Sequence, residues 1–194
     1  MKIVNLLGND FDDACRRLHD HIEEKYHPEL IIGIATGGAV VVEKMKYQED
    51  RNILIIKKQR PFTKTKNKMK FDSWLPYLPE WINNILRLAE LSFNEYRFNK
   101  KGIIDNDSTG IEILKGNVED IFKAKKILIV DDSVDSGATL KNCVQFIGGI
   151  MQTGTEIKTA SLNVTFKKPA IFPTFLLYNR TIVRYPWAND VRKK

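Results

Sequence analysis

The sequence is poor in cysteine and histidine, and this excludes several classes of protein. Its 194 residues include two cysteines and three histidines. Cys15 and Cys143 fall in different predicted helices, which indicates free thiols in a reducing compartment, so we expect a cytoplasmic protein. The histidines show no cysteine or carboxylate spacing typical of a zinc site, and no Ser-His-Asp or Cys-His arrangement is apparent. Disulfide scaffolds, zinc sites and triad hydrolases are therefore not expected.

Long apolar runs are also missing. The longest, such as Ile31–Ala35 and Ala39–Val42, are far below the roughly 20 residues that span a bilayer. The first ten residues lack the apolar core and cleavage site of a signal peptide, and we expect no membrane partner. A hydrophobic content of 43% with 28% charged residues is typical of one globular domain with a modest appendage.

Positive charge is in excess, with a formal net charge of +7. Part of the excess is concentrated between Lys57 and Lys70. A solvated charge run is the more common fate of such a stretch, but its position after a predicted strand also suits an active-site lid. The net charge fits either a polyanionic small substrate or nucleic acid, and we favour the small substrate.

Apolar periodicity predicts alternating strands and helices. We expect helices at 10–25, 39–47 and 138–152, with a short helix ending at 122. We expect strands at 30–35, 53–56, 111–114, 127–130, 157–166, 175–178 and 181–185. This alternation implies an α/β fold with a mainly parallel β-sheet flanked by helices, whose ligands gather at the carboxyl ends of the strands.

Residues 60–108 differ in composition from the rest, and we interpret them as an insertion made of a basic loop and a helix. The helix, Glu80–Phe98, is amphipathic and would be marginal if isolated. We therefore expect it to bury its Trp81, Ile85 and Leu88 side on the core or on a second subunit. We favour a lid hinged on residues 64–70, with dimer contacts as the alternative, and we expect a homodimer.

The most informative segment runs from Ile127 to Leu140. Four apolar residues are followed by the acids Asp131, Asp132 and Asp135 and then by Ser136-Gly137-Ala138-Thr139. Backbone N–H groups around Gly137, with the neighbouring hydroxyls, predict a phosphate cradle at a helix N-terminus. Asp131 and Asp132 can accept hydrogen bonds from a cis-diol or hold a cation between them. Together these features predict a site for a phosphorylated sugar.

This segment resembles the signature of type I phosphoribosyltransferases, which bind 5-phosphoribosyl-1-pyrophosphate, and every position of that signature matches. The resemblance implies a single domain, 1–194, with a hood formed by about residues 1–12 and 166–194. It implies that Asp131 and Asp132 bind the ribose and Mg²⁺, and that Asp135 is the catalytic general base. The 5′-phosphate would bind to Asp135, Ser136, Gly137, Ala138 and Thr139.

A second loop, Thr36-Gly37-Gly38, follows a predicted strand and has the form of the family's pyrophosphate loop. Glycines let the backbone approach a diphosphate and expose its N–H groups. Related purine enzymes usually carry a basic residue where this chain has Thr36, so Lys57, Lys58 or the basic stretch would have to supply the charge. The resemblance also implies a cis peptide between Ala35 and Thr36. We assign Thr36, Gly37, Gly38 and Lys57 to pyrophosphate binding.

The C-terminal segment indicates the acceptor. Lys168-Pro169 and Pro186-Trp187 look like the distal part of bacterial and archaeal xanthine and hypoxanthine phosphoribosyltransferases. That resemblance implies that Lys168 reaches a 6-oxo group and that Trp187 flanks the purine ring. The expected reaction is transfer of the phosphoribosyl group to xanthine, hypoxanthine or guanine, with release of pyrophosphate. The alternatives are a non-catalytic regulator with this fold, or a transferase that acts on an unusual base.

Overall fold

The computed structural model describes residues 1–45, 51–59, 79–102 and 110–188. The basic loop, the lid hinge that we expected at 64–70 and the end of the chain after residue 188 lie outside these ranges. Within the described ranges, no helix is both long enough and apolar enough to cross a membrane.

A six-stranded sheet forms the centre of the molecule, in the order β4-β3-β2-β5-β6-β7. Neighbouring strands are parallel except β3 and β4, which are antiparallel. The fold is therefore α/β with a mainly parallel sheet, as the sequence predicts. The strands are β2 (Leu30–Ile34), β3 (Asn52–Lys58), β4 (Ile111–Lys115), β5 (Lys126–Val134), β6 (Glu156–Val164) and β7 (Phe175–Asn179).

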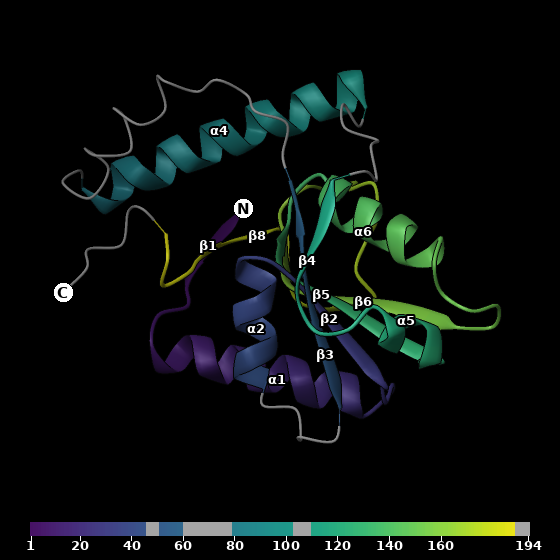
Figure 1. Ribbon diagram of the computed structural model, residues 1–194. Helices are drawn as coiled ribbons and strands as arrows, with labels where there is room; N and C mark the ends of the chain where they lie inside the picture. Colours follow the sequence, from purple (N-terminus) through teal and green to yellow (C-terminus); the bar gives the residue numbers. More distant parts are fainter. Residues whose placement is uncertain (46–50, 60–78, 103–109, 189–194) are drawn as a thin grey trace.

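Helices cover both faces of this sheet (Figure 1). Helices α1 (Asn9–Glu23) and α2 (Gly37–Met45) lie on one face, and α5 (Glu119–Lys123) and α6 (Ala138–Gly148) lie on the other. Successive side chains of a strand point to opposite faces. Ile31 and Leu128 accordingly join the core with α1 and α2, whereas Ile32 and Ile129 join the core with α6. This two-sided burial explains why the central strands are apolar throughout.

Strand β5 is longer than its apolar residues predict. It continues through Asp131 and Asp132 to Val134, and its ladder with β6 extends to the pair Val134 and Val164. Hydrogen bonding to a long neighbouring strand thus holds the acids in an extended conformation, which overrides their weak strand propensity.

A small second sheet joins the two ends of the chain. Strand β1 (Lys2–Asn5), which the sequence did not reveal, pairs in parallel with β8 (Thr181–Arg184). The Leu6 N–H also donates to the Arg184 carbonyl at 2.9 Å. These two strands belong to the two segments that we assigned to a hood, and the hood itself stays a prediction.

Helix α4 (Glu80–Lys101) lies across the carboxyl-terminal end of the main sheet (Figure 1). Trp81 is 64% exposed and Ile85 is 56% exposed, so this side of the helix does not pack on the core of its own chain. The alternative, that it packs on a second subunit, stays a prediction. The helix turns polar side chains toward the core instead. Its Asn84 accepts a hydrogen bond from Arg184 at 2.6 Å, and its Glu95 accepts one from Arg180 at 2.8 Å. Two arginines that need acceptors thus decide which side of the helix faces inward.

Candidate active site

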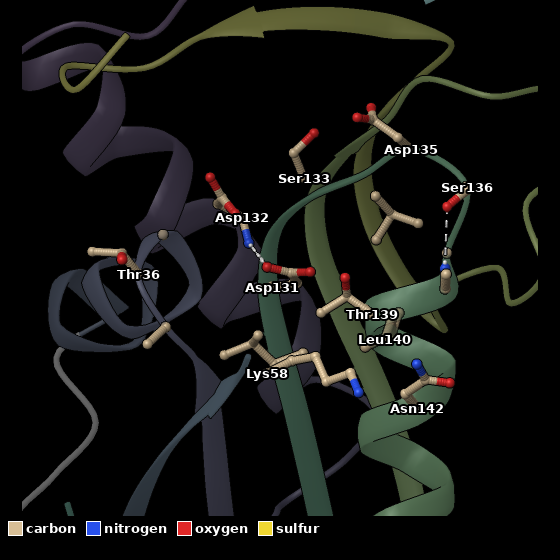
Figure 2. Close-up of a pocket in the computed structure, with 16 residues that line it drawn as sticks. Thr36, Lys58, Asp131, Asp132, Ser133, Asp135, Ser136, Thr139, Leu140 and Asn142 are labelled. Carbon is tan, nitrogen blue, oxygen red and sulfur yellow. Dashed lines mark hydrogen bonds between the residues drawn. The ribbon is translucent and has the colours of Figure 1, made fainter. Parts of the chain in front are cut away.

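A cavity of about 550 Å³ opens at the carboxyl ends of β2 and β5, beside the start of α6. Figure 2 shows the acids of β5 and the hydroxyl side chains of the α6 loop around it. The cavity therefore brings together the two loops that the sequence singled out. Its walls include Thr36, Gly37, Lys58, Asp131, Asp132, Asp135, Ser136, Gly137, Ala138 and Thr139.

The paired acids are held by backbone contacts. The Asp132 N–H donates to the Asp131 carboxylate at 3.0 Å. Burial raises the pKa of Asp132, and the nearby Asp135 charge raises it further, although hydrogen bonds to the carboxylate partly oppose this shift. A Cβ at position 37 would lie 2.2 Å from the carboxyl carbon of Asp132. Gly37 is therefore required for Asp132 to occupy this place.

Asp131 and Asp132 could bind a hard cation such as Mg²⁺ only together with oxygens of a bound substrate or water. No group of three or more His, Cys, Asp or Glu side chains that could hold a metal occurs in the described part of the chain. Mg²⁺ prefers six oxygens and is commonly bound by one or two carboxylates with substrate oxygens and water. Asp131 and Asp132 fit that pattern, because they supply two neighbouring carboxylates beside an open cavity.

The loop before α6 has the geometry of a phosphate cradle. Gly137 has a φ of 75° and caps the helix, a conformation that glycine adopts readily. A Cβ there would also lie 3.0 Å from the backbone N and O of Ile171. The Ser136 hydroxyl accepts from the Ala138 N–H at 3.4 Å, and the Ser136 carbonyl accepts from the Ala170 N–H at 2.7 Å. The loop is thereby fixed with its helix N-terminus beside the cavity.

The Thr36-Gly37-Gly38 loop takes the form that the resemblance implied. The peptide bond between Ala35 and Thr36 is cis, as we predicted. Thr36 and Gly37 line the cavity. Gly38 packs on β5 instead, since a Cβ there would lie 2.4 Å from the Val130 carbonyl oxygen.

The two adjacent lysines of β3, Lys57 and Lys58, point to opposite faces of the sheet, because successive side chains of a strand alternate. Lys58 is half-buried and lines the cavity, and its ammonium group extends toward α6 (Figure 2). Lys57, which we assigned to pyrophosphate, is exposed and lies opposite Glu112 of β4. The structure therefore places Lys58, and not Lys57, among the residues that line this cavity.

A second cavity, of about 290 Å³, adjoins the first, and Asp132, Ser133 and Asp135 line both. Asp135 is exposed, and its carboxylate accepts a hydrogen bond from the Thr165 hydroxyl. The carboxyl end of β5 is thus a wall between two spaces. The remaining lining comes from three elements far apart in the sequence: Arg87, Glu90, Leu91 and Asn94 of α4, Asn163 and Thr165 at the end of β6, and Ile182, Val183 and Tyr185.

Sequence reasoning missed the polar residues that fix this wall. The Tyr185 hydroxyl lies 2.8 Å from the Asp132 carbonyl oxygen and 2.6 Å from the Asn163 side-chain oxygen. Burial raises the pKa of Tyr185 well above its ordinary value, so the hydroxyl stays protonated as a donor. A signal was available, because polar residues alternate with apolar ones in an otherwise buried strand. They are Thr159, Ser161, Asn163 and Thr165.

The two residues that we assigned to the base lie outside both cavities. The Trp187 ring stacks on Tyr185 with centroids 4.9 Å apart and meets Phe11 edge-on at 5.3 Å. Lys168 lines a different cavity, together with Glu95 and Arg180. Neither Lys168 nor Trp187 lines a cavity that Asp135 lines.

The fold and the position of the site define an α/β protein whose ligand cavity lies at the carboxyl ends of parallel strands. A family model described as a phosphoribosyl transferase domain matches residues 7–169, which is more than half of the chain. The chain therefore belongs to the phosphoribosyl transferase domain family, and it is a phosphoribosyltransferase. None of the curated protein sequences compared with this chain matches it.

Solved structures share the fold at low sequence identity. A purine phosphoribosyltransferase from Pyrococcus horikoshii is 19% identical with a TM-score of 0.58, covering 96% of this chain and 94% of that chain. A xanthine-guanine-hypoxanthine phosphoribosyltransferase from Helicobacter pylori is 14% identical with a TM-score of 0.61, with the same coverage. A hypothetical protein from Neisseria gonorrhoeae with bound ppGpp is 14% identical with a TM-score of 0.57, covering 96% and 89%. These likenesses show the fold alone.

Proposed function

We propose that this phosphoribosyltransferase transfers the phosphoribosyl group of 5-phosphoribosyl-1-pyrophosphate to a purine base and releases pyrophosphate. The observation that carries the proposal is the wall shared by the two cavities at Asp132, Ser133 and Asp135. A donor in the larger cavity and a base in the smaller one would meet at this wall. Holding both reactants together supplies much of the rate enhancement of a two-substrate reaction.

The larger cavity has groups that could bind each part of the donor: the 5′-phosphate, the ribose and the pyrophosphate. The loop 135–139 would bind the 5′-phosphate through its backbone N–H groups and hydroxyls. The Thr36 and Gly37 backbone, with Lys58, would bind the pyrophosphate. Asp131 and Asp132 would bind the ribose diol and Mg²⁺, and a bound Mg²⁺ would supply positive charge that stabilises the departing pyrophosphate.

Asp135 would act as the general base. During transfer the bond between C1 and the pyrophosphate oxygen breaks, and a ring nitrogen of the base forms a bond to C1. The proton of that nitrogen passes to the Asp135 carboxylate, and the bonding electrons of C1 leave with the pyrophosphate. The Thr165 hydroxyl donates to Asp135, which keeps the carboxylate oriented toward the smaller cavity.

The smaller cavity suits a flat heterocycle. Leu91, Ile182 and Val183 provide apolar surface, and polar groups surround it, which is the usual composition of a small-molecule site. Two of the similar structures carry purine transferase names, and this supports a purine as the acceptor.

Pyrophosphate release from the donor tests the proposal. Purified protein with Mg²⁺ is supplied with guanine, hypoxanthine, xanthine, adenine, uracil and orotate in turn, and the nucleotide product is confirmed by mass. We expect turnover with at least one purine and none with the pyrimidines. Turnover with a pyrimidine alone would refute the purine assignment but keep the transferase.

A further inference from the structure

Helix α4 presents a mainly polar stripe of side chains to the smaller cavity, in which the acceptor base would bind. Arg87, Glu90, Leu91 and Asn94 all line the cavity, and their spacing of three, four and seven residues places them on one side of a helix. The opposite side carries the exposed Trp81, Ile85, Phe93 and Tyr96. A helix whose function were only to cover a core would normally face the other way. The polar stripe therefore points to contact with a polar ligand.

Contacts on both sides of the stripe hold the helix in place. Near its start, Asn84 accepts from Arg184 at 2.6 Å. Further along, both oxygens of Glu95 accept from Arg180, at 2.8 and 2.9 Å. Phe98 packs on Phe166 with ring centroids 5.6 Å apart. A recognition surface works best on such a fixed element, because its side chains are already oriented before the ligand binds.

The chemistry of Arg87 and Glu90 restricts what they can recognise. A guanidinium only donates hydrogen bonds, and an ionised carboxylate only accepts them. A base edge that satisfies both must present an acceptor beside one or more N–H donors. Guanine has this edge, since its oxo group, ring N–H and amino group follow one another. Hypoxanthine lacks the amino group, xanthine replaces it with a second oxo group, and adenine has an amino group in place of the oxo group.

We propose that α4 selects the acceptor, with Arg87 donating to the oxo group of a guanine-type base and Glu90 accepting from its ring N–H and amino group. This assignment rests on the proposed function, because it concerns the acceptor of the same reaction. It gives the recognition role to the segment that the sequence marked as an insertion.

The test compares kcat/KM for guanine, hypoxanthine, xanthine and adenine at saturating donor. We expect the unchanged protein to prefer guanine. Glu90→Gln should lower the guanine-to-xanthine ratio at least about tenfold, because the amide can donate to the second oxo group. Arg87→Gln should lower kcat/KM for guanine and for hypoxanthine about tenfold or more relative to kcat/KM for adenine, mainly because KM rises.

Two further variants control the result. Arg97→Gln removes an arginine of the same helix that does not line the cavity and whose guanidinium lies over the Phe93 ring, so it should leave all ratios unchanged. Lys168→Ala tests the rival, in which Lys168 reads the oxo group. Arg87 and Glu90 also have interactions within the protein, so thermal unfolding of each variant is measured to show that it is folded.

Each outcome separates the two proposals. Unchanged ratios in Glu90→Gln and Arg87→Gln, or a change only in Lys168→Ala, would overturn the role of α4 and leave the transferase intact. A preference of the unchanged protein for xanthine or adenine would also overturn it. Absence of turnover with every base would overturn both proposals.

Discussion

The two cavities share a wall, but the chain builds them in different ways. The larger cavity takes most of its lining from two short segments, residues 34–37 and 131–142. The smaller cavity takes its lining from α4, from the ends of β5 and β6, and from β8 and the residues after it. A site made by a strand, its loop and the next helix is encoded by consecutive residues. A site made where distant elements meet depends on how those elements pack.

This contrast has a chemical counterpart. The donor presents the same phosphate and the same diol whichever base is used, and backbone N–H groups at a helix N-terminus suffice to bind the phosphate. Acceptor bases differ from one another at their edges, so their selection needs side chains with distinct donor and acceptor patterns. We expect changes in the larger cavity to affect the donor with every base, and changes in the smaller cavity to affect bases unequally.

The largest effect is expected at the wall itself. Asp135→Asn should lower kcat by about 10²-fold or more, because the amide cannot accept the proton from the base. Binding of the donor, followed by calorimetry, should be nearly unchanged. Turnover equal to that of the unchanged protein would remove Asp135 from the mechanism.

Gly37→Ala tests the close approach between the two loops. Its Cβ would lie 2.2 Å from the carboxyl group of Asp132, so the loop or the carboxylate must move. We expect kcat/KM for the donor to fall about 10²-fold, the scale of a misplacement of about 1 Å. Gly148→Ala at the carboxyl end of α6, where nothing lies within 4 Å of the added Cβ, is the control for activity. Equal activities of the two variants would contradict the prediction.

The adjacent lysines of β3 give a matched pair. Lys58→Met should raise KM for the donor about tenfold, the scale of one lost hydrogen bond to a charged group. Lys57→Met should change it little, because Lys57 lies outside the cavity. The opposite result would restore our sequence-based assignment of Lys57 to the pyrophosphate.

Asp132 should lower the stability of the ligand-free protein. The pKa of Asp132 is raised above the ordinary 3.8, with burial as the largest cause, so the folded state binds the proton more tightly than the unfolded state. Stability therefore falls as the pH rises from 3.8 through the pKa of the folded state. Asp132→Asn should therefore raise the melting temperature at neutral pH. The gain should vanish as the pH is lowered below 3.8, where the acid is protonated in both the folded and the unfolded state. A gain independent of pH would refute this explanation.

The smallest effect on folding is expected at the exposed side of α4. Trp81→Glu should change the free energy of unfolding by no more than about 0.5 kcal/mol, because the side chain is 64% exposed.

The homodimer that we expect remains a prediction, and light scattering tests it. A dimer that Trp81→Glu dissociates, while Phe122→Glu on α5 does not, would place the interface on α4. A monomeric unchanged protein would refute the homodimer.

Residue order alone predicted a mainly parallel sheet and the segment 127–140, because strand periodicity and a strand–loop–helix motif are local properties. It also indicated the glycine loop and its cis peptide through resemblance. It could not decide whether the Trp81 side of α4 packs on the core, because the partners of the inward side, Arg180 and Arg184, lie about 85 and 100 residues further along. It did not find β1, which forms only by pairing with β8. Only the tertiary structure decided the smaller cavity, because its lining comes from α4, the ends of β5 and β6, and residues 182–185. These elements lie far apart in the sequence and meet only when α4 packs on the sheet.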